Sequence, residues 1–208
     1  MADGMSLEEV NSMYFDVLRE IGNIGAGNAT TALAQLLQTK VDMSVPKVSL
    51  LDFKDVGSVM GGEEQIMVGI LLGVEGDVTG SIMFMIEEAG AKHLVSKLMM
   101  GMGMSEGEGF NEMELSALNE IGNIITGAYL NALSGLTNLC IYPTPPALTV
   151  DMAGAILSVP AIQFGIQGDQ ILLIQNNFFD EMELDGYFIL LPDVESYATI
   201  LGALGISM

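Results

Sequence analysis

Two groups of polar side chains recur at one spacing, and their types suit the positioning of a water molecule beside a phosphate. The groups, 100 positions apart, are Asp16, Glu20 and Asn23 and then Ser116, Glu120 and Asn123. An asparagine amide carries both a donor and an acceptor, so it can hold water in a defined orientation, and a carboxylate can pair with a partner's lysine. Phosphoryl transfer depends mainly on positioning and charge neutralisation. Such an amide, inserted into a partner's metal-loaded phosphoaspartate site, would be sufficient for hydrolysis.

The residues around these groups indicate an internal duplication. The pentapeptide Glu-Ile-Gly-Asn-Ile occurs at Glu20–Ile24 and Glu120–Ile124, and Pro46 recurs as Pro146 at the same offset of 100. On a helix, each polar group occupies positions i, i+4 and i+7 and therefore one face. A single Glu-x-x-Asn is usually a solvated face. Two copies in register, each followed by proline after 22 residues, favour a site present twice.

Other enzyme chemistries find little support in the sequence. His93 is the only histidine, which removes histidine-based triads and metal clusters, and Cys140 lies in an apolar stretch typical of a core. Gly22–Gly27 has a Gly-x-x-Gly-x-Gly pattern, but it does not follow a predicted strand, as a dinucleotide fingerprint must. The 16 methionines are more typical of core filling than of a metal site.

The composition limits the partners. With 27 acidic and six basic residues, the formal net charge is −21, so nucleic acid and acidic membranes are repelled. A partner with a basic face is the natural complement, although most of the charge is explained by solubility alone. We expect no membrane insertion, because no apolar run is long enough to span a bilayer. The first residues lack the features of a signal peptide, which favours a cytoplasmic protein.

The hydrophobic pattern predicts the same element order in each half: helix, strand, variable segment, two strands, helix. In the first half these are a helix from a Ser6 cap to Leu37, an extended segment Val41–Phe53, a Gly-rich variable segment Asp55–Glu64, strands Gln65–Val74 and Val78–Ile86, and a helix Glu87–Met100. In the second half they are a helix from an Asn111 cap to about Ser134, an extended segment Ala147–Met152, a variable segment Ala153–Gln167, strands Gln170–Phe179 and Leu184–Leu191, and a helix Pro192–Leu204.

The predicted fold class is α/β, internally duplicated with pseudo-two-fold symmetry. We expect one mainly antiparallel sheet built from both halves, with the two long motif-bearing helices packed on one side. Residues 1–208 are expected to form a single domain of two repeats, roughly 10–104 and 110–208. Because an internal duplication can replace a homodimer, a monomer is favoured.

The variable segment Ala153–Gln167 is longer and more apolar than its counterpart in the first half, and Pro160 interrupts it. If it lies on the surface, it is a candidate protein-docking patch. The alternative is that it covers the core. The sequence leaves both interpretations open.

The complete pattern, Asp or Ser-x3-Glu-x2-Asn-x22-Pro, resembles the signature of the CheC/CheX/FliY chemotaxis phosphatase family. Two intact copies in about 200 residues are similar to its CheC-type members, and the resemblance covers essentially the whole chain. It implies a CheC-like fold and a phosphatase that hydrolyses the aspartyl phosphate of the response regulator CheY.

The resemblance also implies roles for the repeated residues. Asn23 and Asn123 would orient the attacking water, and Glu20 and Glu120 would pair with the regulator's lysine. The Mg²⁺ would be supplied in the CheY active site, with no cofactor of the chain's own. Asp16, Ser116, Pro46 and Pro146 would be supporting residues.

A second partner implied by the resemblance is the receptor deamidase CheD. We expect its contact on the apolar segment of the second half, at Asp151, Ile156, Leu157, Ile162 and Phe164. A different hypothesis is a non-catalytic adaptor that sequesters CheY-phosphate or CheD. A small-molecule-binding domain ranks below both.

The two copies of the motif differ in one neighbouring residue. Arg19 precedes Glu20, whereas Asn119 precedes Glu120. An arginine there can compete for the carboxylate or repel a partner's lysine. The second site is therefore expected to be the better one.

Overall fold

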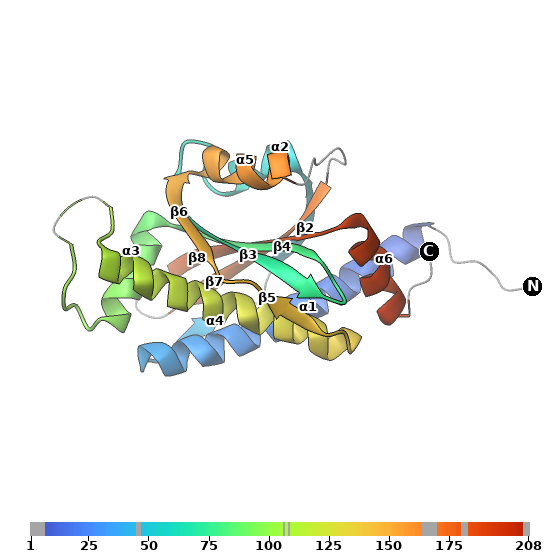
Figure 1. Ribbon diagram of the computed structural model, residues 1–208, viewed down its shortest axis with the longest axis horizontal. Coiled ribbons are helices and arrows are strands. Elements are labelled where there is room, and N and C mark those ends of the chain that lie inside the picture. Colours follow the sequence, from blue (N-terminus) through green and yellow to red (C-terminus); the bar gives the residue numbers. More distant parts are fainter. Residues whose placement is uncertain are drawn as a thin grey trace, which may run out of the picture.

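The computed structural model describes residues 7–44, 47–105, 107, 109–163, 170–179 and 183–205 (Figure 1). Its elements fall into two sets with the same order. The first set is α1 (Leu7–Leu37), β1 (Asp42–Met43), β2 (Lys47–Asp52), α2 (Phe53–Val59), β3 (Ile66–Gly76), β4 (Gly80–Glu87) and α3 (Glu88–Leu98). The second is α4 (Glu112–Thr137), β5 (Ile141–Pro143), β6 (Ala147–Met152), α5 (Ala153–Gln163), β7 (Gln170–Phe179), β8 (Glu183–Pro192) and α6 (Val194–Ala203).

One eight-stranded antiparallel sheet contains strands from both halves, as predicted. Its main order is β1-β7-β8-β4-β3-β5, with β2 also beside β7 and β6 also beside β3. The central pair, β4 and β8, joins the halves, and Phe84 lies opposite Phe188 there. Each half also places its outer strands on the other half, because β2 pairs with β7 and β6 with β3. Neither half can therefore complete its own part of the sheet.

The strand register repeats between the halves. Met152 lies opposite Ile66 in the β6–β3 ladder, and Asp52 lies opposite Gln170 in the β2–β7 ladder. Asp52 and Met152 are 100 positions apart, whereas Ile66 and Gln170 are 104 apart. The four extra residues of the second half thus fall between β6 and β7, in the segment that contains α5, and leave the pairing unchanged.

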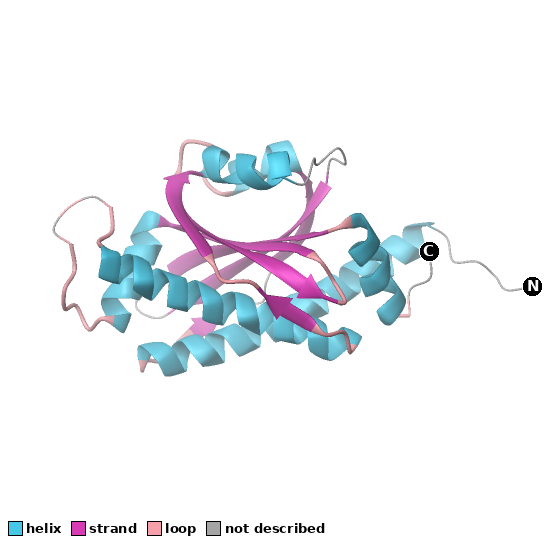
Figure 2. Cartoon of the chain, viewed as in Figure 1, coloured by secondary structure: helices cyan, strands magenta, loops and turns pink. Residues whose placement is uncertain are grey.

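Helices cover both faces of the sheet (Figure 2). The long helices α1 and α4 run in opposite directions across one face, and α2 and α5 lie on the other (Figure 1). Alternate strand residues face the two layers. Ile70 and Phe84 belong to the larger core beneath α1 and α4, whereas Met67 and Met85 belong to the smaller core beneath α2 and α5.

Each of the two variable segments contains a helix that was not predicted. Helix α2 extends to Val59, and Val56 and Met60 are fully buried against the sheet. Pro160 does not interrupt the second segment but lies inside helix α5. Burial of apolar side chains outweighs the weak helix propensity of these short segments.

Two predicted helix starts need separate comment. Pro192 is the last residue of β8, opposite Gly80, and α6 begins at Val194 after the N-cap Asp193. The prediction that Pro192 opens the last helix was therefore wrong. The predicted Ser6 cap lies outside the described residues.

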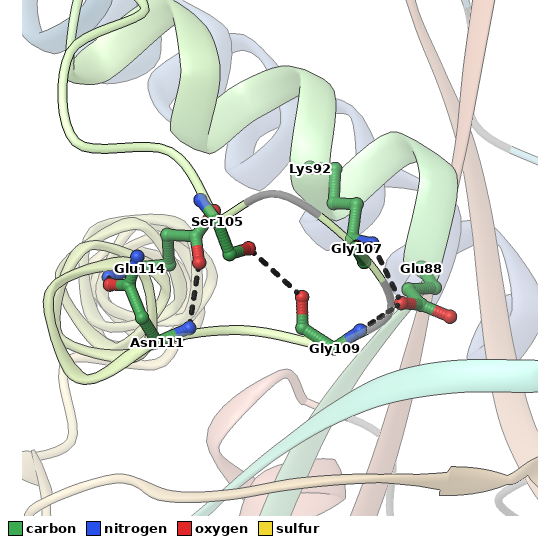
Figure 3. A network of polar contacts seen from close by, with 7 residues as sticks. All are labelled: Glu88, Lys92, Ser105, Gly107, Gly109, Asn111 and Glu114. Atoms are coloured by element: carbon green, nitrogen blue, oxygen red, sulfur yellow. Dashed lines mark hydrogen bonds and ion pairs between the residues drawn. The ribbon is translucent and has the colours of Figure 1, made fainter.

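The start of α4 is fixed by the predicted capping box (Figure 3). The Asn111 side chain accepts a hydrogen bond from the Glu114 N–H at 3.0 Å, and the Glu114 carboxylate accepts from the Asn111 N–H at 2.7 Å. The same carboxylate accepts from the Ser105 N–H at 3.2 Å. Burial of Glu114 opposes its ionisation, but the hydrogen bonds from Asn111 and Ser105 prevail and lower its pKa. Glu114 is therefore a buried anion at the positive end of the helix dipole.

The loop between α3 and α4 is tied to both helices. The Asn111 side chain donates to the Gly103 carbonyl at 2.9 Å, and the Gly109 N–H donates to Glu88 at 3.3 Å. Glu88 also pairs with Lys92 at 3.2 Å. Figure 3 shows this carboxylate between the loop and α3. The loop is thus held against the beginning of α4.

The repeated glycine permits close packing of α4 on the sheet. A Cβ atom added to Gly122 would overlap Ile70, meeting its Cγ2 at 2.9 Å and its Cβ at 3.2 Å. Because the overlap involves the branch point of Ile70, a rotation of the side-chain tip cannot relieve it. Gly127, on the same helix, has open space at the corresponding point.

We predict that Glu114→Gln destabilises the protein by about 1–2 kcal/mol near neutral pH. Each carboxylate oxygen of Glu114 accepts from a backbone N–H, of Ser105 or of Asn111. The NH2 group of a glutamine would face one of these donors and leave it without an acceptor. The lowered pKa of Glu114 means that its charged form stabilises the folded state. The difference from wild type should be complete above pH 4.5, the ordinary value for a glutamate, and should shrink as the pH falls below it. Urea unfolding at several pH values measures this. Glu112→Gln, an exposed change in the same turn, is the control; an equal effect there would contradict the prediction.

We also predict that Gly122→Ala lowers the free energy of unfolding by about 1–3 kcal/mol through overpacking against Ile70. Gly127→Ala should instead raise it by up to about 1 kcal/mol, because alanine favours the helix and meets no neighbour. Urea unfolding of the two variants compares the effects directly. A stabilising Gly122→Ala would show that α4 does not need this close approach.

Candidate functional site

Both repeated polar groups lie on the outer faces of the long helices. Glu20 and Asn23 are exposed on α1, and Glu120 and Asn123 are exposed on α4. The isoleucine between them points inward in each copy; Ile121, for example, is 1% exposed. Each helix therefore presents a carboxylate and an amide on a ridge, with the first isoleucine of the pentapeptide, Ile21 or Ile121, anchored in the core.

The supporting residue of the first group forms an ion pair. The Asp16 carboxylate lies 2.7 Å from the Arg19 guanidinium, and both side chains are about 60% exposed (62% and 61%). Arg19 was expected to compete for the Glu20 carboxylate. In the structure it pairs with Asp16 instead. An exposed pair of this kind contributes at most about 1 kcal/mol to stability. The ion pair engages Arg19, the cationic residue that precedes Glu20 in the sequence, with Asp16.

Ser116, the counterpart of Asp16, bonds within its own helix. Its hydroxyl donates to the Glu112 carbonyl at 2.9 Å. This bond fixes the serine side chain on the helix surface, on the same face as Glu120 and Asn123. Asp16 therefore forms an ion pair with Arg19, whereas Ser116 forms a hydrogen bond to the backbone of its own helix.

Of the two repeated prolines, only Pro146 can be placed. It is half-buried in the turn between β5 and β6, whereas Pro46 lies outside the described residues. The chain just before Pro146 is fastened to β3: the Thr144 hydroxyl accepts from the Gly73 N–H at 2.8 Å, and the Thr144 N–H donates to the Gly73 carbonyl at 2.9 Å. The proline thus belongs to the sheet edge and not to the polar ridge.

A buried tyrosine joins the two helices that carry the polar groups. Tyr129 of α4 is 2% exposed, and its ring occupies the space where a Cβ on Gly25 of α1 would lie, 2.5 Å from Cδ1. Its hydroxyl donates to the buried Asn176 of β7 at 2.9 Å, and its ring centroid lies 4.1 Å from that of Phe188. Burial raises the pKa of Tyr129, so it remains a neutral donor.

The internal repeat does not predict a structural role for Tyr129. The residues at the equivalent positions in the other half are Ala29 and Leu72, so neither member of the Tyr129–Asn176 pair is duplicated. Only the absence of a side chain at Gly25, two residues after Asn23, hinted that something approaches α1 closely there. Tyr129 positions the helices and does not reach their polar ridges.

The predicted CheD-binding segment divides into buried and exposed residues. Ile156 and Leu157 are 2% and 4% exposed and pack in the smaller core. The core-covering interpretation is therefore correct for these two residues, and they are not available on the surface. Asp151 is exposed; Phe164 and the side chain of Ile162 lie outside what the structure describes.

The described part of the chain holds neither a group of metal ligands nor a membrane-spanning helix. No three His, Cys, Asp or Glu side chains there gather closely enough to hold a metal ion. No helix there is both long and apolar enough to cross a membrane. The exposed groups of the pentapeptide on each ridge are a carboxylate and an amide.

Comparison with known proteins agrees with the duplicated motif. The model of the CheC-like family matches residues 13–50 and 113–150. These two segments carry the polar groups and the prolines, and they are offset by the same 100 positions.

Related proteins cover nearly the whole chain. It is 38% identical to the CheY-P phosphatase CheC of Bacillus subtilis over 203 residues, which is 96% of this chain and 97% of that protein. Its fold is similar to that of Thermotoga maritima FliY, with a TM-score of 0.73, 21% identity and full coverage of both chains. A chain in the complex of CheX with CheY, BeF3 and Mg²⁺ from Borrelia burgdorferi has a TM-score of 0.50 and 20% identity, over 80% of this chain and 94% of that one. With its two motif copies in place on α1 and α4, the chain belongs to the CheC-like family.

Proposed function

We propose that this protein hydrolyses the aspartyl phosphate of a CheY-type response regulator, with one site on α1 and one on α4. The observation that carries the proposal is the exposed pair of glutamate and asparagine, Glu20 with Asn23 and Glu120 with Asn123, on each ridge. The 38% identical relative named CheY-P phosphatase CheC supports it. Two exposed polar side chains on one helix face are suited to entering the cleft of another protein.

Each residue of the pair has a separate task in this mechanism. The asparagine amide enters the regulator's active site and holds one water molecule in line with the phosphorus atom. Attack by that water breaks the bond between phosphorus and the aspartate oxygen, so inorganic phosphate leaves and the regulator's carboxylate is restored. The glutamate pairs with a lysine of the regulator and fixes the orientation of the complex. The regulator supplies its own Mg²⁺, which neutralises charge on the phosphoryl group.

The charge of the chain favours this partner interaction. A net charge of −21 attracts a partner that presents a lysine beside its active site and raises the association rate at low ionic strength. The expected cytoplasmic location and the monomeric state remain part of the proposal. CheD also remains a predicted partner; of the three residues of its predicted contact set whose side chains the structure describes, Asp151 is exposed.

A non-catalytic adaptor is the second candidate function. The same exposed ridges would suit it, but sequestration does not require a water-orienting amide in both copies. Substoichiometric protein separates the two: repeated turnover of the phosphorylated regulator supports the phosphatase, whereas slowed phosphate loss or no effect supports the adaptor.

We predict that Asn23→Ala and Asn123→Ala each remove one site. The double variant should lose at least about 100-fold in dephosphorylation rate, because the water is no longer positioned. Asn123→Ala should cost more than Asn23→Ala, as the sequence comparison of the two sites suggests. Decay of the phosphorylated regulator is the readout, and Asn28→Ala and Asn131→Ala, both exposed on the same helices, are the controls. An active double variant would exclude the amides from the chemistry.

The glutamates are predicted to act in docking. In an Asn23→Ala background, Glu120→Gln should raise KM about fivefold with little change in kcat, since it removes one interfacial ion pair. It should also weaken the dependence of kcat/KM on ionic strength. Glu75→Gln, an exposed change on the β3–β4 hairpin, is the control. A fall in kcat at constant KM would instead assign Glu120 a part in the chemical step.

A further inference from the structure

Three methionines are unusually exposed in the loop that follows α3 and in the first turn of α4. Met100, Met102 and Met113 are 70%, 69% and 67% exposed, the highest values among the large apolar residues that the structure describes. Met100 and Met102 lie in the loop between α3 and α4, and Met113 lies in the first turn of α4. We call these three residues the methionine rim.

The methionine rim adjoins the second polar ridge through Met113. Met113, Ser116, Glu120 and Asn123 occupy positions i, i+3, i+7 and i+10 of α4 and therefore one face of the helix. Met113 precedes Ser116 by about 4.5 Å along the helix axis, at 1.5 Å per residue. The apolar surface thus begins where the polar ridge ends.

Gly103 of the loop lies beside Met113 and is held there by a hydrogen bond. A Cβ atom at Gly103 would lie 3.8 Å from the Met113 sulfur. The Asn111 side chain donates to the Gly103 carbonyl, and the Ser105 N–H donates to the buried Glu114. Figure 3 shows Ser105 of the loop close to Asn111 and Glu114 at the start of α4. Met102 is therefore displayed from a segment that is anchored on both sides, by Gly103 and by the end of α3.

We propose that the methionine rim is part of the docking surface for the response regulator at the second site, which rests on the function proposed above. It covers apolar side chains that border the regulator's active site while Glu120 and Asn123 enter that site. Methionine side chains are flexible and polarizable, so they adapt to a partner surface. The rim acts on the stability of the complex and leaves the water-positioning step to Asn123.

Charge favours this occupant over two others. Two copies of a chain with net charge −21 repel each other, and so do this chain and an anionic lipid surface. The exposed Glu112, next to Met113, adds to that repulsion locally. A regulator that brings a lysine to Glu120 is attracted to the same region.

The test uses the full chain with only the second site active. In the Asn23→Ala background, the double change Met100→Ser and Met102→Ser should raise KM about three- to tenfold and leave kcat unchanged, as loss of peripheral apolar contacts does. Met113→Ser should act in the same direction. Met152→Ser is the matched control, because Met152 is also exposed, at 46%, but lies on β6 beside α5. Unfolding in urea confirms that each variant is folded.

An unchanged KM in the rim variants, or an equal rise in the Met152→Ser control, overturns the proposal. A fall in kcat alone also overturns it, because the rim would then affect the chemistry and not the docking. The proposed function has its own test. It is refuted if the Asn23→Ala variant and the Asn23→Ala, Asn123→Ala double variant dephosphorylate the regulator at the same rate. A fluorescence titration of the regulator with each variant provides a second readout, in which only the rim changes should weaken binding.

Discussion

The pairing of each half's outer strands with the other half is the constraint on which the structure depends. Strand β2, which follows the motif-bearing helix α1, pairs with β7 of the second half, and β6, which follows α4, pairs with β3 of the first half. The helices before these strands are consequently placed on the same face of one sheet. The duplicated site is therefore a property of the assembled sheet, and neither copy is an independent module.

The outer exposure of the polar ridges depends on how firmly the inner faces of α1 and α4 are held. Gly122 brings α4 onto Ile70, and Gly25 makes room on α1 for the ring of Tyr129. Tyr129 then fixes α4 to β7 through the buried Asn176. A hydrogen-bonded pair with no solvent access is costly to break. The side chains proposed to enter a partner's active site thus stand on helices with little freedom to shift, which reduces the entropy lost on docking.

Much of the fold and of the candidate site was predictable from local signals. The two hairpins and the capping box of Asn111 and Glu114 follow from short-range patterns, and the duplication follows from identical residues at a constant offset. Helix α2 was missed because it is only seven residues long and its stability comes from burial of Val56 and Met60. Ile156 and Leu157 were ambiguous because an apolar segment looks the same whether it covers a core or a partner. The Tyr129–Asn176 pair spans 47 residues and has no counterpart in the repeat.

The change of offset from 100 to 104 between the halves shows where this architecture tolerates variation in length. Extra residues between β6 and β7 lie outside every ladder, so they are absorbed without displacing a strand by one position. A single inserted residue within β7 would instead turn its side chains to the opposite layer. The two halves can thus diverge in length and surface on the α2 and α5 side while the spacing on the α1 and α4 side stays fixed. The face that carries α2 and α5 can therefore acquire new contacts, whereas strand pairing fixes the positions of α1 and α4 on the other face.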